Sequence, residues 1–305
     1  MNNILTNIRS LELETVQNLK NSKSLNTTRA YQSDFKDFSL FCSKNGFQSM
    51  PTLPKILSLY LTELSKTCKY STLKRRLASI GMLHKIRGYY IDIKHPVIIE
   101  NLMGIKRKNG SNQKGKKPLL ISHLKLLINV IDKSSENDIR KIRDKAILLI
   151  GFAGGFRRSE LVNIEKDDIE FVDKGVKIFV KRSKTDQSGE GMIKAIPYFN
   201  DTNFCPVIAL KKWINISRNI EDKIFNISDK SVALILKKYV NIAGLDSNKY
   251  SGHSLRSGFA TSTAEYGAEE RNIMAMTGHK SSEMVRRYIK EANLFKNNAL
   301  NKIKI

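Results

Sequence analysis

One polar segment places the strongest constraint on how this chain folds. Residues 106–117 read KRKNGSNQKGKK, with two glycines and no apolar side chain, so they cannot add to a hydrophobic core. Apolar residues recur on both sides of this segment through the 305-residue chain, a length that fits two ordinary domains. The sequence therefore predicts two domains, residues 1–107 and 118–305, joined by a basic linker at 108–117.

Composition excludes several classes of protein. Hydrophobic residues make up 41% of the chain, which is enough to bury two cores and excludes bulk disorder. The sequence has no run of 18 apolar residues and begins with a polar, acid-containing stretch, so we expect no transmembrane helix, no secretory signal and no membrane partner. Cys42, Cys68 and Cys205 show no CxxC spacing. We therefore expect neither disulfides nor a zinc site. The same pattern predicts a cytoplasmic location.

The charge balance indicates the partner. Lys and Arg number 53 against 29 Asp and Glu, a net charge of +24. Residues 1–117 hold 21 basic and 7 acidic residues, and the remainder holds 32 and 22, so both domains are basic. A polyanion that touches both domains fits this distribution, and double-stranded DNA is the partner we expect. Basicity alone is also compatible with a soluble protein that binds no nucleic acid.

Helical spacing of apolar residues predicts an all-helical first domain. Phe35, Phe38 and Cys42, for example, recur three or four residues apart. The expected helices cover residues 26–46, 52–64, 71–86 and 97–103. In the third helix, Leu77 continues the buried stripe past a basic cluster, so we expect much of the cluster to face outward. The predicted DNA contacts of this domain are Lys74, Arg75, Arg76, Lys106, Arg107 and Lys108, although a solvated charged face explains the first three equally well.

The second domain mixes helices with short strands. Strands are predicted at 169–172, 176–180 and 193–196, with Asp173-Lys-Gly175 as the first hairpin turn. Helices are predicted at 122–132, 138–152, 206–214, 229–241, 254–266 and 269–276. The predicted fold class of the whole chain is therefore mainly α with a small antiparallel sheet.

Three motifs in the second domain suggest phosphate chemistry. In Gly154-Gly-Phe-Arg-Arg-Ser-Glu-Leu161, two glycines end one helix and Arg157 opens the next, where a guanidinium can bind phosphate. His253 and Arg256 are three residues apart on one helix face and can hold one phosphate together. His279 precedes Tyr288 by nine residues. Each motif alone is also compatible with a structural role, chance spacing or, for Tyr288, an ordinary surface position.

Taken in chain order, these positions resemble the tyrosine recombinase (phage integrase) family. The ordered positions are Arg157, Lys184, His253, Arg256, His279 and Tyr288. The resemblance covers nearly the whole chain, and the segments Asn26–Phe38, Ser71–Leu77 and Arg182–Thr185 are especially similar to the Cre branch. It implies a SAM-like helical core-binding domain and a catalytic domain that close on DNA as a C-shaped clamp.

The resemblance also implies residue roles. Arg157 and Arg256 match the two arginines that clamp the scissile phosphate, and Tyr288 matches the nucleophile. His253 and His279 match the two histidine positions of the pocket. Lys184 matches the lysine between strands two and three, the best candidate acid for the leaving oxygen, with Lys181 and Lys194 as nearby alternatives. Glu160 matches an acidic position that orients Arg157 or His253, or it simply forms a surface ion pair.

The implied reaction is strand cleavage and transfer through a 3′-phosphotyrosyl bond and a Holliday junction, in integration, excision or resolution, with no metal and no cofactor. The C-terminal segment 289–305 is amphipathic. The resemblance implies that this tail docks on the next protomer of a homo-tetramer on DNA, whereas a tail folded on its own domain is the alternative. Two other functions remain open: a catalytically silent DNA-binding regulator and a type IB topoisomerase-like enzyme.

Overall fold

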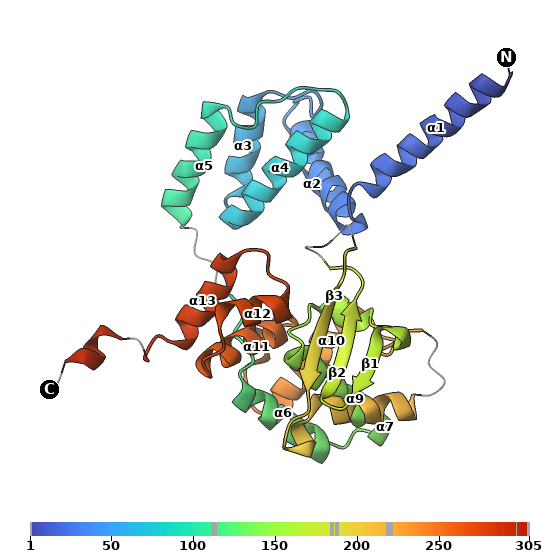
Figure 1. Ribbon diagram of the computed structural model, residues 1–305. Helices are drawn as coiled ribbons and strands as arrows, with labels where there is room; N and C mark the ends of the chain where they lie inside the picture. Colours follow the sequence, from blue (N-terminus) through green and yellow to red (C-terminus); the bar gives the residue numbers. More distant parts are fainter. Residues whose placement is uncertain are drawn as a thin grey trace. The chain divides into compact units, whose positions relative to one another are not determined.

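The chain is mainly helical and carries one small antiparallel sheet, which confirms the predicted fold class (Figure 1). The computed structural model describes residues 2–110, 115–183, 186, 189–217, 222–296 and 298–303. Two compact units make up the chain, Met1–Lys114 (unit 1) and Gly115–Ile305 (unit 2).

Unit 1 is helical, and four of its helices share an apolar core. Its helices are α1 (Asn2–Asn21), α2 (Leu25–Lys44), α3 (Pro54–Leu64), α4 (Tyr70–Ile86) and α5 (Pro96–Asn109). Phe38, Leu57, Ile80 and Ile98, one from each of α2 to α5, are fully buried together. The sequence did not predict α1. Among the described residues no member of this core comes from α1, which explains why an apolar periodicity did not reveal it.

The end of α5 corrects the predicted linker. A short helix was expected at 97–103, with Lys106 already in polar linker, but α5 continues to Asn109. Ile105 is only 8% exposed and holds the last turns against the core of unit 1. Lys106, Arg107 and Lys108 occupy the last turn, where cations stabilise the negative end of a helix. The helix ends at Gly110, whose φ of +71° favours glycine.

Unit 2 contains every helix and strand predicted for it, with ends shifted by at most two residues. Its helices are α6 (Ile121–Lys133), α7 (Asp138–Ala153), α8 (Arg158–Val162), α9 (Pro206–Ile216), α10 (Asp229–Ile242), α11 (His253–Glu265), α12 (Glu270–Thr277) and α13 (Ser282–Ala292). The described residues of unit 2 also form short 3-10 turns at Lys166–Asp168, Thr202–Phe204, Ser247–Lys249 and Ala299–Lys302. α7 is the central helix, because every residue from Ala146 to Ala153 is buried.

The sheet of unit 2 has the order β1 (Ile169–Val172), β2 (Gly175–Val180) and β3 (Met192–Pro197). Val176 pairs with Ile196 and Ile178 pairs with Lys194, so alternate side chains share one face. Val176, Ile178 and Ile196 are buried there against the core. Lys194 lies on the same face and is also 0% exposed.

A close backbone contact positions α11. A Cβ at Gly258 would lie 1.9 Å from the carbonyl oxygen of Leu119, so only glycine fits there. The Leu119 amide donates to the Ser254 carbonyl, and the Ile121 amide donates to the Ser262 hydroxyl. The chain that enters unit 2 therefore runs directly against the helix that carries His253 and Arg256.

Candidate functional site

The structure brings five of the six predicted pocket residues together in unit 2, and the sixth, Lys184, lies outside the described residues. Arg157 is the N-cap of α8, His253 and Arg256 are in the first turn of α11, His279 follows α12, and Tyr288 is in α13. Hydrogen bonds or ring contacts link the last four to one another. Residues more than 100 positions apart in the chain therefore share one site.

Arg157 is held by Glu160. The Glu160 carboxylate accepts from the Arg157 backbone amide at 2.9 Å and from Arg157 Nη1 at 2.6 Å. Only 1% of the Glu160 side chain is exposed, against 17% for Arg157. Both hydrogen bonds run from Arg157 to Glu160, so they hold the guanidinium in place at the start of α8. Of the two roles open for Glu160, the contacts match the orientation of Arg157 rather than a surface ion pair.

Arg256 is a buried guanidinium with fixed partners. It is 1% exposed, and its Nη1 donates to the Gly155 carbonyl at 2.8 Å. Gly155 adopts a φ of +53°, so the glycine pair before Arg157 both turns the chain and supplies this acceptor. Burial, followed by the charge of Arg157, lowers the pKa of Arg256 to about 10, while Glu160 opposes the shift. Arg256 stays protonated at neutral pH.

Contacts on both ring nitrogens determine the tautomer of His279. Arg256 Nη2 lies 3.3 Å from His279 Nε2, and a guanidinium can only donate, so Nε2 accepts. His279 Nδ1 then carries the proton and donates to Thr277 Oγ1 at 2.7 Å. The Thr277 hydroxyl donates onward to the Ile273 carbonyl. Burial and the neighbouring Arg256 and Arg157 lower the pKa of His279 to about 4, so the ring is neutral at pH 7.

Tyr288 faces His253. The Tyr288 hydroxyl lies 3.3 Å from His253 Nε2, and Tyr288 is 8% exposed. Burial, then Arg256, Arg157 and Arg158, lower the pKa of His253, which leaves a neutral imidazole that can accept a proton. Burial raises the pKa of Tyr288, whereas Arg256 and Arg287 act against that rise. The free protein therefore holds a neutral tyrosine beside a neutral proton acceptor.

A cavity of about 390 Å³ opens beside these residues. It is lined by Arg157, Arg158, Ser159, Asp229, Ser251, Gly252 and His253. Arg158 lies 3.7 Å from the Asp229 carboxylate, and both side chains are about 40% exposed. Neither Arg158 nor Asp229 was predicted from the sequence to lie at the site. Arg158 belongs to the motif that contains Arg157, so its position near the site could have been predicted from the sequence. Its pairing with Asp229, which joins α8 to α10, could not be predicted from any pattern in the sequence.

The two alternative lysines have other partners. Lys181 forms ion pairs with Glu165 and Asp168, the latter at 3.1 Å. Lys194 is fully buried, and its ammonium donates to the carbonyl oxygens of Gly154, at 2.7 Å, and Met276. Lys194 is closed off from solvent, and Lys181, although 51% exposed, is paired with two carboxylates, so Lys184 remains the candidate from the sequence.

The predicted DNA contacts of unit 1 separate into two groups. Lys74, Arg75, Lys106, Arg107 and Lys108 are exposed, although Arg75 also pairs with the buried carboxylate of Asp34. Arg76 was expected to face outward with Lys74, but its side chain is only 18% exposed and binds Asp37 and the Tyr60 hydroxyl. The inward position arises because Arg76 lies three residues after the buried Leu73, on the edge of the apolar stripe of α4.

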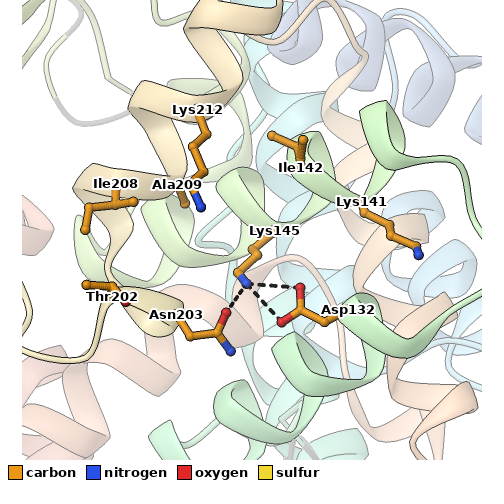
Figure 2. A pocket seen from close by; sticks show the side chains of 9 residues that line it. All are labelled: Asp132, Lys141, Ile142, Lys145, Thr202, Asn203, Ile208, Ala209 and Lys212. Atoms are coloured by element: carbon orange, nitrogen blue, oxygen red, sulfur yellow. Dashed lines mark hydrogen bonds and ion pairs between the residues drawn. The ribbon is translucent and has the colours of Figure 1, made fainter.

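A second cavity, of about 270 Å³, contains none of the predicted site residues (Figure 2). Its lysines come from α7 and α9: Lys141, Lys145 and Lys212. As Figure 2 shows, Lys145 binds both carboxylate oxygens of Asp132, at 3.0 Å each, and the Asn203 side chain. Its charge is thus already matched within the protein.

Two kinds of feature are absent from the described part of the chain. Within it, no three His, Cys, Asp or Glu side chains gather in an arrangement that could bind a metal ion. No helix there is both long and apolar enough to cross a membrane.

Two solved structures share this fold. One is the XerH site-specific recombinase in a post-cleavage complex with palindromic difH substrate, with a TM-score of 0.62, 18% identity, and coverage of 81% of this chain and 73% of that chain. The other is a lambda integrase(75–356) dimer bound to a COC′ core site, with a TM-score of 0.60, 18% identity, and coverage of 96% and 98%.

Sequence comparisons assign the family. Residues 122–294 match the phage integrase family. The chain is 40% identical to an integrase/recombinase XerD homolog of Selenomonas ruminantium, over 98% of this chain and 91% of that protein. It is 25% identical to tyrosine recombinase XerC of Syntrophus aciditrophicus, over 91% of each. The family match over more than half of the chain and the 40% identity over nearly all of it show that the chain belongs to the phage integrase family, the tyrosine recombinases, which are site-specific DNA recombinases.

Proposed function

We propose that this chain cuts and rejoins duplex DNA at a defined site through a phosphotyrosyl bond to Tyr288. The observation that carries the proposal is the 3.3 Å separation of the Tyr288 hydroxyl and His253 Nε2, beside the buried Arg256. A tyrosine has an ordinary pKa of about 10, so attack at neutral pH needs a proton acceptor or nearby cations. His253 and Arg256 supply both.

The first step is a balanced displacement at phosphorus. The Tyr288 oxygen attacks the scissile phosphate and forms a 3′-phosphotyrosyl bond, while the bond from phosphorus to the 5′ oxygen breaks. The phenolic proton passes to His253 Nε2, which is neutral because burial and the arginines lower its pKa. Lys184 is our candidate to donate a proton to the leaving 5′ oxygen.

The two arginines stabilise charge on the phosphate. Their guanidiniums can donate to the non-bridging oxygens, whose charge grows in the transition state. Arg157 is fixed in advance by Glu160, and Arg256 by Gly155. Because both cations are already oriented, the protein reorganises little when the phosphate enters.

The second step rejoins the strands. A 5′ hydroxyl from a partner duplex attacks the phosphotyrosine, releases the Tyr288 oxygen and returns the proton, and two such rounds pass through a Holliday junction. The phosphodiester energy stays in the protein–DNA bond, so the cycle needs no ATP. Integration or excision of a mobile element and resolution of plasmid or chromosome dimers would use the same steps, in the cytoplasm.

Unit 1 is our proposed core-binding domain. The exposed cations Lys74 and Arg75 on α4, together with Lys106, Arg107 and Lys108 at the end of α5, would contact DNA phosphates. Each phosphate neutralised by such a contact releases counterions, so binding would weaken steeply as salt rises.

A cyclic tetramer on two DNA sites is the proposed assembly. The segment after α13 exposes apolar side chains at 54% to 86%, namely Leu294, Phe295, Leu300 and Ile303. Unit 2 also has an almost wholly apolar cavity of about 460 Å³, whose walls include Phe152, Pro197, Phe259 and Tyr266. A tail that leaves one protomer and fills this cavity on the next makes a head-to-tail contact that closes into a ring. The predicted tail began at residue 289, but α13 continues to Ala292, so the exchanging part begins after it.

Covalent capture tests the proposed function. Wild-type protein, Tyr288→Phe and the control Tyr90→Phe, whose residue is 86% exposed, are each mixed with DNA fragments that flank the gene. The mixtures are then denatured in detergent. We expect DNA to stay attached to wild type and to Tyr90→Phe but not to Tyr288→Phe, with equal DNA binding before denaturation. An adduct with Tyr288→Phe would reject the nucleophile.

The same samples separate the alternatives. A DNA-binding regulator would bind a site tightly yet give no adduct with any of the three proteins. A topoisomerase-like enzyme would relax supercoiled plasmid that lacks the captured site. Sequencing the captured ends identifies the cleaved position, which must recur in every fragment if the reaction is site-specific.

A further inference from the structure

The buried ammonium of Lys194 has no role in the reaction described above. Lys194 lies on β3, is 0% exposed, and is paired across the sheet with Ile178. Its ammonium donates to the carbonyl oxygens of Gly154, at 2.7 Å, and Met276. The Phe156 ring centroid lies 4.7 Å from Nζ, so the ring face also contacts the cation. The side chain is therefore fully engaged inside the protein.

Both acceptors belong to helix C-termini. Gly154 is the C-cap of α7, and Met276 lies in the last turn of α12. The last four carbonyls of a helix have no partner within it, and the negative end of the helix dipole attracts a cation. One ammonium on β3 thus caps two helices that are 82 and 40 residues away in the chain.

Each of these helix ends leads into a site residue. Gly154 begins the turn that carries Phe156 and Arg157, and Met276 stands three residues before His279. The partners of the site lie in the same two segments: Gly155 binds Arg256, and Thr277 binds His279. A change in the distance between the Gly154 and Met276 carbonyls would therefore change the distance between Arg157 and His279.

We propose that Lys194 is a positioning residue that ties the end of α7 to the end of α12 and thereby sets the spacing of Arg157, Arg256 and His279 around the phosphate. This inference rests on the proposed cleavage by Tyr288. Lys194 does not touch the phosphate in this role. It acts only through the two backbone segments that it joins.

The charges around Lys194 agree with this position. Burial, together with Arg256 and Arg157, lowers its pKa to about 7, whereas Glu160 acts in the opposite direction. Lys194 in turn contributes to the lowered pKa of His279. The ammonium therefore interacts with the charged groups of the site although solvent cannot reach it.

The test compares Lys194→Met with Ile178→Ala. Met keeps the length of the side chain and removes the donors, whereas Ile178→Ala disturbs the same buried face from the cross-strand position without touching either carbonyl. DNA affinity, melting temperature and the single-turnover rate of adduct formation on a nicked site are measured for both. We expect both variants to bind DNA within about threefold of wild type. We expect Lys194→Met to form the adduct about 10²-fold more slowly than Ile178→Ala, the scale of misplacing a catalytic group by about 1 Å.

Rescue by Lys194→Arg distinguishes positioning from general packing. Arginine restores a cation with several donors, so we expect it to recover at least about a tenth of the wild-type rate. If Lys194→Met is too unstable to compare, Lys194→Gln, which keeps two N–H donors without the charge, takes its place and is expected to fall between Met and Arg.

Two results would overturn the inference. One is a Lys194→Met (or Lys194→Gln) rate equal to that of Ile178→Ala at a similar melting temperature, which would reduce Lys194 to a core residue. The other is a folded Lys194→Arg protein no faster than Lys194→Met. Failure of the proposed function is recognised separately, because wild-type protein would then form no adduct at all.

Discussion

Glu160 accepts two hydrogen bonds from Arg157, one from its backbone amide and one from its guanidinium, while only 1% of the Glu160 side chain reaches solvent. A single carboxylate thus begins α8, orients a phosphate-binding arginine and partly balances the buried charge of Arg256. The geometry of the site and the stability of unit 2 depend on the same ion pair.

Substitution Glu160→Gln is therefore expected to lower both stability and rate. Loss of a buried charge leaves Arg157 and Arg256 less compensated, and breaking a buried ion pair costs about 3 kcal/mol. Denaturant unfolding should show a decrease of this order, and the rate of adduct formation should fall by about tenfold or more. Glu170→Gln is the matched control, because the Glu170–Lys177 pair is exposed and is worth about 1 kcal/mol or less. Equal unfolding curves for the two variants would contradict the assigned role.

Because His253 is the proposed proton acceptor, the cleavage rate should depend on pH. It accepts a proton only when neutral, and its pKa lies below the ordinary 6.5, so the cleavage rate should fall only as the pH drops below 6.5. The substitution Arg158→Ala removes a neighbouring cation and should raise the pKa of His253. The fall in cleavage rate on the acid side of the pH profile should then begin at a higher pH. Rates at DNA concentrations below saturation report the free protein and give the comparison. Arg271→Ala, at an 84% exposed side chain, should leave the limb unchanged.

Removing the His253 imidazole should have a larger effect on the cleavage rate than shifting its pKa. His253→Ala should slow adduct formation by about 10² to 10⁴, the usual contribution of general base catalysis, while DNA binding is retained. A His253→Ala protein that cleaves at the wild-type rate with an unchanged pH profile would show that another group receives the Tyr288 proton.

Alanine substitutions at two neighbouring cations of α4, Arg76 and Lys74, should have opposite effects on stability and DNA binding. Arg76→Ala removes the guanidinium that binds Asp37 and Tyr60, so unit 1 should lose about 1.5–3 kcal/mol of stability. Lys74→Ala changes an exposed side chain and should alter stability by less than about 0.5 kcal/mol. It should instead weaken DNA binding and reduce the salt slope by about one. Unfolding curves and binding titrations at several salt concentrations measure both quantities, and a reversed pattern would reject the division between the two residues.

Truncation after Asn293 tests the tail. α13 ends at Ala292, so this cut leaves the helix that carries Tyr288 complete. We expect single-site DNA binding to stay within about threefold, while recombination between two sites on a plasmid falls at least tenfold, because the apolar cavity of the next protomer stays empty. Phe295→Ser in the full chain should reproduce part of the loss, since Phe295 is 86% exposed. Recombination by the truncated protein at the full rate would leave the tail without a role in assembly.

Much of the fold could be read from local pattern. The three strands and most helices of unit 2 follow from apolar periodicity and turn residues, which act over a few neighbouring positions. α1 was missed because none of its described side chains belongs to the core of unit 1, and α5 was cut short because its basic last turn has the composition of a linker. Composition alone does not distinguish a solvated helix end from an irregular segment.

Side-chain partners could not be predicted in the same way. Arg76 belongs to a basic cluster in the sequence, yet contacts across α2, α3 and α4 turn it inward. Lys194 was an alternative acid for the leaving oxygen, yet it caps two helices whose ends the sequence places 40 and 82 residues away. Such contacts depend on how whole elements pack, which no local spacing records.

The sequence by itself determined the family, the order of the site residues, the helix that Arg157 opens and the helix that carries His253 and Arg256, because each depends on residue identity and short-range periodicity. The tertiary structure decided which groups meet: His253 with Tyr288, Arg256 with Gly155 and His279, and Lys194 with Gly154 and Met276. It also decided the proton positions and lowered pKa values of the histidines, because burial and neighbouring charge exist only after distant segments pack together.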